Sequence, residues 1–161
     1  MALDRIIDPK LRRNLPRYVV QCTLATLVLL VLLLVRDAIS SAVVVAAIGS
    51  TAFVVFIMPR SQSADARHVL GGHGIALLTG ALATVVDQDV ALQFALGGSI
   101  AVGAAMFLMA ATNTEHAPAA GSALGVVAAG LSWSLVLMLV LSVASLALIR
   151  QLLLPWLEDL Y

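Results

Sequence analysis

Long apolar runs alternate with short polar breaks along this chain, and this pattern restricts the fold more than any other feature. A helix needs about 20 apolar residues to cross the hydrocarbon core of a bilayer. The runs at 18–35, 38–58, 68–86 and 90–112 fit that length. The last run, 119–149, is much longer, so it forms either one strongly tilted helix or a helix that is broken or partly re-entrant near its start, with the main span beginning near Leu131.

Composition supports the same class of fold. Hydrophobic residues make up 61% of the chain and charged residues 11%, whereas a soluble domain carries about 25% charged residues. We therefore expect an all-α integral membrane protein with about five transmembrane helices. The spans leave no length for a basic soluble domain, which argues against nucleic-acid binding. Cys22 is the single cysteine, which excludes an internal disulfide and a cysteine-based zinc site.

The two ends of the chain differ from the apolar centre. Residues 1–17 mix apolar and positively charged side chains at helical spacing, which predicts a basic amphipathic segment lying at the membrane surface. Residues 150–161 include Trp156 and Tyr161, residues that favour the headgroup level, so they predict an interfacial tail. Residues 18–149 would form a single transmembrane domain.

The distribution of basic residues predicts the orientation. If the amino end is cytoplasmic and there are five spans, seven basic residues face the cytoplasm: Arg5, Lys10, Arg12, Arg13, Arg17, Arg60 and Arg67. Only Arg36 and Arg150 would then face outward. Cytoplasmic loops are enriched in Lys and Arg, so we expect the amino end inside and the carboxyl end outside, in a bacterial inner membrane.

Two polar breaks stand out as candidate sites. Residues 67–74 read Arg-His-Val-Leu-Gly-Gly-His-Gly, and residues 113–122 read Asn-Thr-Glu-His-Ala-Pro-Ala-Ala-Gly-Ser. Irregular backbone at membrane depth must be buried in protein or line a wet cavity. Both breaks also fall on the predicted cytoplasmic side, so a shared site there is possible.

A weak internal repeat relates these two breaks. Gly49-Ser50 and Gly98-Ser99 lie 49 positions apart, as do Gly72 and Gly121. Each unit would contain two helices joined by a polar loop, giving a leading helix plus two similarly oriented hairpins. Transporters with parallel repeats bind their substrates at the repeat interface.

Two segments resemble the HPP family of small integral membrane proteins. Residues 116–124, His-Ala-Pro-Ala-Ala-Gly-Ser-Ala-Leu, are similar to the family's His-Pro-Pro signature. Residues 67–73 are similar to a Pro-Arg-Asn-Val-x-Gly-Gly-His stretch that precedes it. Ala117 replaces the first proline of the signature, Ala66 replaces the proline before Arg67, and His68 replaces the asparagine.

The resemblance covers about residues 18–148 and implies a compact bundle of transmembrane helices. Members in plastids and cyanobacteria are associated with nitrite transport, so the resemblance implies passage of a small monovalent anion.

The residues themselves are compatible with an anion site. Helix starts present free backbone N–H groups and about half a positive charge, and glycines allow a ligand to approach them. We expect helices to begin near Gly71-Gly72 and near Ala120-Gly121, and to form the site together. The candidate binding residues are Arg67, Gly71, Gly72, His73, His116, Gly121 and Ser122, and the candidate pore-lining residues are Ser50, Thr51 and Ser99.

Several alternatives remain open at this stage. The chain could be a non-transporting membrane scaffold or partner subunit, in which the glycines are helix interfaces and the histidines bond neighbouring helices. It could also carry a cation or a metal, although three histidines without a spacing motif are weak evidence for a metal site. We see no catalytic dyad and expect no enzyme activity, cofactor or resident metal. A chain this small is expected to form a homo-oligomer in the bilayer.

Overall fold

The structure is a computed structural model of the chain, and it describes residues 15–17, 19–21, 23–24, 42–86 and 91–160. Residues 15–17, 19–21 and 23–24 are helical, five α-helices and one short 3-10 helix are assigned over residues 42–86 and 91–160, and the described residues contain no strand. The elements are α2 (Ala42–Ile57), η3 (Gln62–Ala64), α3 (Ala66–Ala83), α4 (Ala91–Thr112), α5 (Ala117–Ala129) and α6 (Trp133–Leu153). Most of the predicted surface segment and first span lies outside the described residues.

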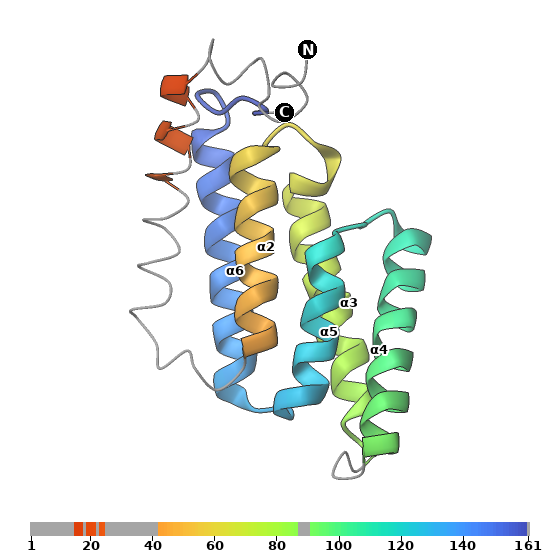
Figure 1. The fold of residues 1–161 in the computed structure, drawn as a ribbon. Helices are drawn as coiled ribbons and strands as arrows, with labels where there is room; N and C mark the ends of the chain where they lie inside the picture. Colours follow the sequence, from red (N-terminus) through yellow and green to blue (C-terminus); the bar gives the residue numbers. More distant parts are fainter. Residues whose placement is uncertain (1–14, 18, 22, 25–41, 87–90, 161) are drawn as a thin grey trace, which may run out of the picture.

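The all-α membrane character agrees with the sequence prediction. Two helices, Leu92–Thr112 and Trp133–Leu153, are long and apolar enough to cross a membrane, and α2 and α5 are shorter apolar helices. Successive helices run in alternating directions, with α2 beside α6, α3 beside α5, and α4 at the far edge (Figure 1). The two hairpins α2–α3 and α4–α5 point the same way, as the repeat predicts (Figure 1). Common ancestry of the two units stays a prediction.

The long final run is broken into two helices. α5 ends at Ala129, Gly130 has a φ of +72° that an L side chain rarely adopts, and α6 begins at Trp133. The Ser132 side chain caps α6 by accepting a hydrogen bond from the backbone N–H of Leu135 at 3.3 Å. The broken form is therefore the one observed, and α5 and α6 run in opposite directions (Figure 1).

This break overturns the predicted placement of the carboxyl end. The Arg150 guanidinium, near the end of α6, donates to the Pro59 carbonyl at 2.9 and 2.6 Å and pairs with Asp65 at 2.7 Å. The backbone N–H of Leu160 donates to the Ile57 carbonyl at 2.9 Å. The prediction that Arg60 and Arg150 lie on opposite sides is wrong, because the turn at Gly130 sends the chain back to the end where α2 meets α3.

Cysteine labelling tests this arrangement. In a chain with Cys22 replaced by Ser, we expect cysteines placed at the exposed positions Gln62 and Trp156 to react with an impermeant maleimide from the same side of the membrane. A cysteine at the exposed Ser132, in the turn between α5 and α6, should react only from the other side. Labelling of Gln62→Cys and Trp156→Cys from opposite sides would contradict the fold.

Small residues bring the central helices close together. A Cβ atom on Gly80 of α3 would lie 2.7 Å from the Val126 Cβ and 2.8 Å from the Ala123 carbonyl oxygen of α5. A Cβ atom on Gly125 of α5 would lie 2.5 Å from a methyl carbon of Val44 in α2. α5 therefore packs tightly against both neighbours. The side chains buried between α3, α4 and α5 are mostly small: Ala76, Ala101, Ala105, Met109, Ala119, Ala123 and Val127.

Candidate functional site

The two helices expected to form the anion site begin about one turn earlier than the sequence suggested. α3 starts at Ala66 after the extended residue Asp65, and α5 starts at Ala117 after the extended residue His116. Pro118 occupies the first turn of α5, where its missing N–H costs nothing. The free amides of a helix belong to its first four residues. The predicted helix start at Gly71-Gly72 is therefore wrong, because these amides lie inside α3. α5 begins three residues before the predicted start at Ala120-Gly121, so Ala120 still lies in its first turn.

The glycines of the first break serve close packing instead. A Cβ atom on Gly72 would lie 2.9 Å from the His116 Cβ and 3.1 Å from the Thr114 carbonyl oxygen. A Cβ atom on Gly71 would lie 2.8 Å from the Thr114 methyl carbon. These glycines let the connection between α4 and α5 lie directly on α3, which carries His116 into the interior. A Cβ atom on Gly121 would meet only the Ala47 side chain, at an ordinary 3.5 Å.

A chain of hydrogen bonds joins side chains from both breaks. Ser122 Oγ lies 2.9 Å from His73 Nδ1, and His73 Nε2 lies 2.9 Å from Thr51 Oγ1. Thr51 Oγ1 in turn lies 3.0 Å from His116 Nε2. His116 Nδ1 lies 2.8 Å from the Ser63 carbonyl oxygen and 3.3 Å from Ser63 Oγ. We call Ser122, His73, Thr51, His116 and Ser63 the histidine–hydroxyl chain.

Most of the histidine–hydroxyl chain is inaccessible to solvent. Thr51, His116 and Ser122 have no exposed surface and His73 is 3% exposed, while Ser63 is half-buried. The two imidazole rings lie 5.2 Å apart, centroid to centroid, at an interplanar angle of 55°. Thr51 lies on α2, His73 on α3 and Ser122 on α5, so the histidine–hydroxyl chain links these three helices. Buried polar groups stabilise a fold only when they are bonded in this way.

His116 lies in the connection between α4 and α5, outside both helices. Burial lowers its pKa from 6.5 to about 4. The hydrogen bond to the Ser63 carbonyl opposes this shift, and the proximity of His68 adds to it. The His116 imidazole is therefore neutral near pH 7, with a proton on only one of its two nitrogens.

A small cavity borders the histidine–hydroxyl chain at His73. It has a volume of about 100 Å³ and lies between α3 and α6, with the lining residues Leu70, His73, Gly74, Leu77, Leu139, Val140 and Val143. His73 is the only residue in this lining that carries a titratable side chain. Any solute in the cavity would meet apolar walls and one imidazole.

The other site residues predicted from the sequence lie away from the histidine–hydroxyl chain. Arg67 is exposed and donates to the Thr112 carbonyl at 3.0 Å. Ser50 and Ser99 are exposed, so of the three candidate pore-lining residues the structure brings only Thr51 to the histidines. Sequence reasoning missed Ser63, because its contact with His116 joins positions 53 residues apart and no local pattern marks it.

The third histidine has a different environment. His68 is 4% exposed, and its Nε2 lies 3.7 Å from a Glu115 carboxylate oxygen. Within the described part of the chain, neither ring nitrogen of His68 has a hydrogen-bond partner. In the same residues, no group of three or more His, Cys, Asp or Glu side chains could hold a metal ion.

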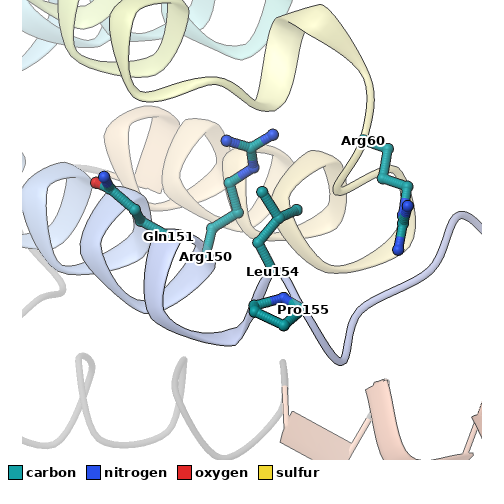
Figure 2. Close-up of a pocket in the computed structure, with 5 residues that line it drawn as sticks. All are labelled: Arg60, Arg150, Gln151, Leu154 and Pro155. Atoms are coloured by element: carbon teal, nitrogen blue, oxygen red, sulfur yellow. The ribbon is translucent and has the colours of Figure 1, made fainter.

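A larger pocket opens at the end of the bundle where the tail returns. It has a volume of about 540 Å³ and is lined by Arg60, Arg150, Gln151, Leu154 and Pro155 (Figure 2). Arg150 rises from α6 and Arg60 from the α2–α3 connection, with Leu154 and Pro155 between them (Figure 2). Arg60 also donates to the Leu157 carbonyl at 3.3 and 3.4 Å and, through its backbone N–H, to Asp159 at 2.9 Å.

Comparison with known protein families confirms the resemblance seen in the two motifs. The family described as HPP, transmembrane region, matches residues 10–158. Comparisons with curated proteins and with solved structures find no match. The family match covers nearly the whole chain and includes both polar breaks, every described helix and the histidine–hydroxyl chain. The chain is therefore an integral membrane protein that belongs to the HPP transmembrane family.

Proposed function

We propose that this protein carries a small monovalent anion, such as nitrite, across a membrane, and that the anion passes through the cavity beside His73. One observation carries the proposal: two imidazoles and two hydroxyls are bonded together in the interior of an apolar bundle, at the edge of a cavity. Polar groups at membrane depth are costly, and they commonly mark the path of a solute or proton.

The chemistry of the chain favours an anion over a metal cation. Imidazole N–H groups and hydroxyls donate hydrogen bonds to an anion, and the five side chains include no carboxylate. Both nearby carboxylates, Asp65 and Glu115, are exposed. A proton taken up by His73 would supply the positive charge that an anion needs among apolar walls, where charges interact more strongly than in water.

The size of the cavity restricts the solute. A water molecule occupies about 30 Å³ in the liquid. A cavity of about 100 Å³ therefore has room for an ion of a few atoms and little more. Nitrite, nitrate and formate fall within this size, whereas a larger organic anion does not.

We also propose an orientation and an assembly. Arg17, Arg60, Arg67 and Arg150 gather at the end where the carboxyl tail packs, and the positive-inside rule makes this the cytoplasmic end in a bacterial inner membrane. α4 exposes a continuous set of large apolar side chains, which contact lipid or a second copy in a homo-oligomer: Leu92, Leu96, Ile100, Met106 and Phe107.

A scaffold function is the second candidate, and one observation favours it. Both nitrogens of His73 and of His116 already have protein partners within hydrogen-bond distance, as expected for side chains that only join helices. If the protein is a scaffold, replacing a histidine lowers the stability of the fold and has no other effect. Flux measurements on folded variants separate the two candidates.

The test is nitrite flux into liposomes that contain the purified protein, beside empty liposomes. We expect flux in the wild type, competition by nitrate and formate, and at least tenfold lower flux in His73→Gln and in His116→Ala. His68→Ala is the matched control, because His68 is equally buried and lies outside the histidine–hydroxyl chain. Absence of flux above empty liposomes with folded wild-type protein would refute the proposed function.

A substitution at Gly74 tests the cavity while it leaves every hydrogen bond of the histidine–hydroxyl chain in place. Gly74 lines the cavity, and a Cβ atom there would meet nothing within 4 Å. Gly74→Leu should therefore narrow the cavity and lower nitrite flux several-fold without unfolding the protein. The control is Gly103→Leu on α4, where a Cβ atom also meets nothing within 4 Å and which does not line the cavity beside His73. Equal flux in the two variants would remove the cavity from the path.

A further inference from the structure

The histidine–hydroxyl chain has a direction, which follows from its acceptors. The Ser63 carbonyl oxygen can only accept, so His116 Nδ1, 2.8 Å away, carries a proton. The neutral His116 ring then has a bare Nε2, which accepts the hydroxyl proton of Thr51 at 3.0 Å whenever that proton is not donated to the Ala47 carbonyl, also 3.0 Å from Thr51 Oγ1. Thr51 has a single proton to donate, so its oxygen accepts from His73 Nε2–H at 2.9 Å.

The last link completes the same pattern. With its proton on Nε2, the neutral His73 ring has a bare Nδ1, which accepts from the Ser122 hydroxyl at 2.9 Å. All four bonds therefore point from α5 toward η3, and each has one donor and one acceptor. The two histidines hold opposite tautomers: Nε2–H in His73 and Nδ1–H in His116.

We infer that this aligned chain is a proton relay, which connects the cavity beside His73 with Ser63 at the α2–α3 connection. The Ser122 hydroxyl turns away from His73 Nδ1, which then takes up a proton from a donor in the cavity. His73 Nε2 passes its proton to Thr51 Oγ1, the Thr51 hydroxyl passes its own to His116 Nε2, and His116 Nδ1 releases one to Ser63 Oγ and on to water. One proton enters and one leaves, and each imidazole stays neutral but ends with its proton on the opposite nitrogen.

The surroundings suit both ends of such a relay. Ser63 is half-buried and follows the exposed Gln62, so the proton leaves close to solvent. The cavity end is shielded by Leu139, Val140 and Val143 of α6. The charged or titratable groups nearest the histidine–hydroxyl chain are Asp65 at the start of α3, His68 on α3 and Glu115 on the α4–α5 connection, the last two 3.7 Å from each other.

Thr51 is the link at which the relay can be interrupted and reset. Its hydroxyl lies 3.0 Å from the Ala47 carbonyl of its own helix as well as 3.0 Å from His116 Nε2. When the hydroxyl donates to the Ala47 carbonyl, the hydrogen bond to His116 is lost and no proton can pass along the relay. After each transfer the Thr51 hydroxyl must turn, and the imidazoles must reorient, before another proton can follow.

Proton flux into liposomes loaded with a pH-sensitive dye tests the relay, with the membrane potential clamped by potassium and valinomycin. We expect an imposed pH gradient to collapse at least tenfold faster with wild-type protein than in empty liposomes. Thr51→Val should lose this flux, because it removes the hydroxyl between the imidazoles at nearly constant volume. Thr51→Ser should retain it. Thr79→Val is the matched control, since Thr79 is buried but donates only to Ala76 of its own helix.

The tautomers provide a second readout that needs no variant. Nitrogen-15 NMR of the wild-type protein should show a protonated Nε2 in His73 and a protonated Nδ1 in His116. The same tautomer in both rings would overturn the relay, and so would full proton flux in folded Thr51→Val. Nitrite flux measured on the same liposomes keeps the proposals apart: proton flux without nitrite flux supports the relay and refutes anion transport, and the reverse result refutes the relay alone.

Discussion

Gly125→Ala should add an overpacking cost of about 2 kcal/mol to the protein, the middle of the range for a well-packed interior. The added methyl group would lie 2.5 Å from a methyl carbon of Val44 and 3.0 Å from the Val44 backbone nitrogen. A side chain can rotate away from such a contact, but a helix backbone cannot. α2 would have to move away from α5, and Thr51, on the same helix, would move with it.

A matched glycine isolates the steric effect. Gly103→Ala adds the same methyl group where nothing lies within 4 Å, and alanine favours a helix over glycine by about 1 kcal/mol. Both variants gain this term, so they should differ by the overpacking cost alone, about 2 kcal/mol in free energy of unfolding, measured by denaturant titration in detergent micelles. Adding Val44→Ala to Gly125→Ala should recover part of the loss by removing the nearest methyl carbon. Equal stability of Gly125→Ala and Gly103→Ala would show that α2 and α5 do not pack this closely.

Arg150→Met is the second substitution that should strongly destabilise the protein. We expect it to lower the free energy of unfolding by about 2 to 3 kcal/mol. Removing one partner of a buried, hydrogen-bonded charge costs about 3 to 5 kcal/mol. We expect less here, because Asp65 is 51% exposed and water weakens its pairing with Arg150. The Pro59 carbonyl loses both of its hydrogen bonds from the guanidinium, and the end of α2 loses its link to α6.

Arg67→Met is the control for this prediction. Arg67 has the same charge, but its side chain is exposed and donates a single bond to the Thr112 carbonyl. We expect the free energy of unfolding to fall by less than about 1 kcal/mol, as is usual for exposed charged contacts. If Arg150→Met and Arg67→Met unfold at the same denaturant concentration, then Arg150 does not join α6 to the α2–α3 connection.

The class of fold and most helices could be predicted from the sequence because apolar run length is a direct measure of a membrane span. The predicted spans 38–58, 68–86 and 90–112 agree with α2, α3 and α4 to within a few residues. The break in the last run was predicted only as one of two alternatives. Gly130 lies among other glycines and alanines, and its positive φ is what distinguishes it as the place where the chain turns.

The candidate site was predicted in part. His73, His116, Ser122 and Thr51 were all singled out, and the structure joins them, but through side chains rather than through free amides at helix starts. The start of α3 was misplaced because Ala66 is a good helix former that extends α3 by more than a turn. Which hydroxyl reaches which imidazole depends on how closely α2, α3 and α5 pack, and no local pattern encodes that distance.

The shortness of α5 has a consequence for how the protein would respond to voltage. Its 13 residues cover about 20 Å at ~1.5 Å per residue, whereas the apolar core of a bilayer is about 30 Å thick. Between the polar connections at its two ends, residues 113–116 and 130–132, the apolar length at the centre of the bundle would therefore be shorter than that of the surrounding lipid. Moving one elementary charge across a membrane potential of 100 mV changes its energy by about 2.3 kcal/mol. Along α5 this potential would drop over the shorter distance. A charge moving past His73 and Thr51 would thus experience a steeper electric field than one crossing the surrounding lipid.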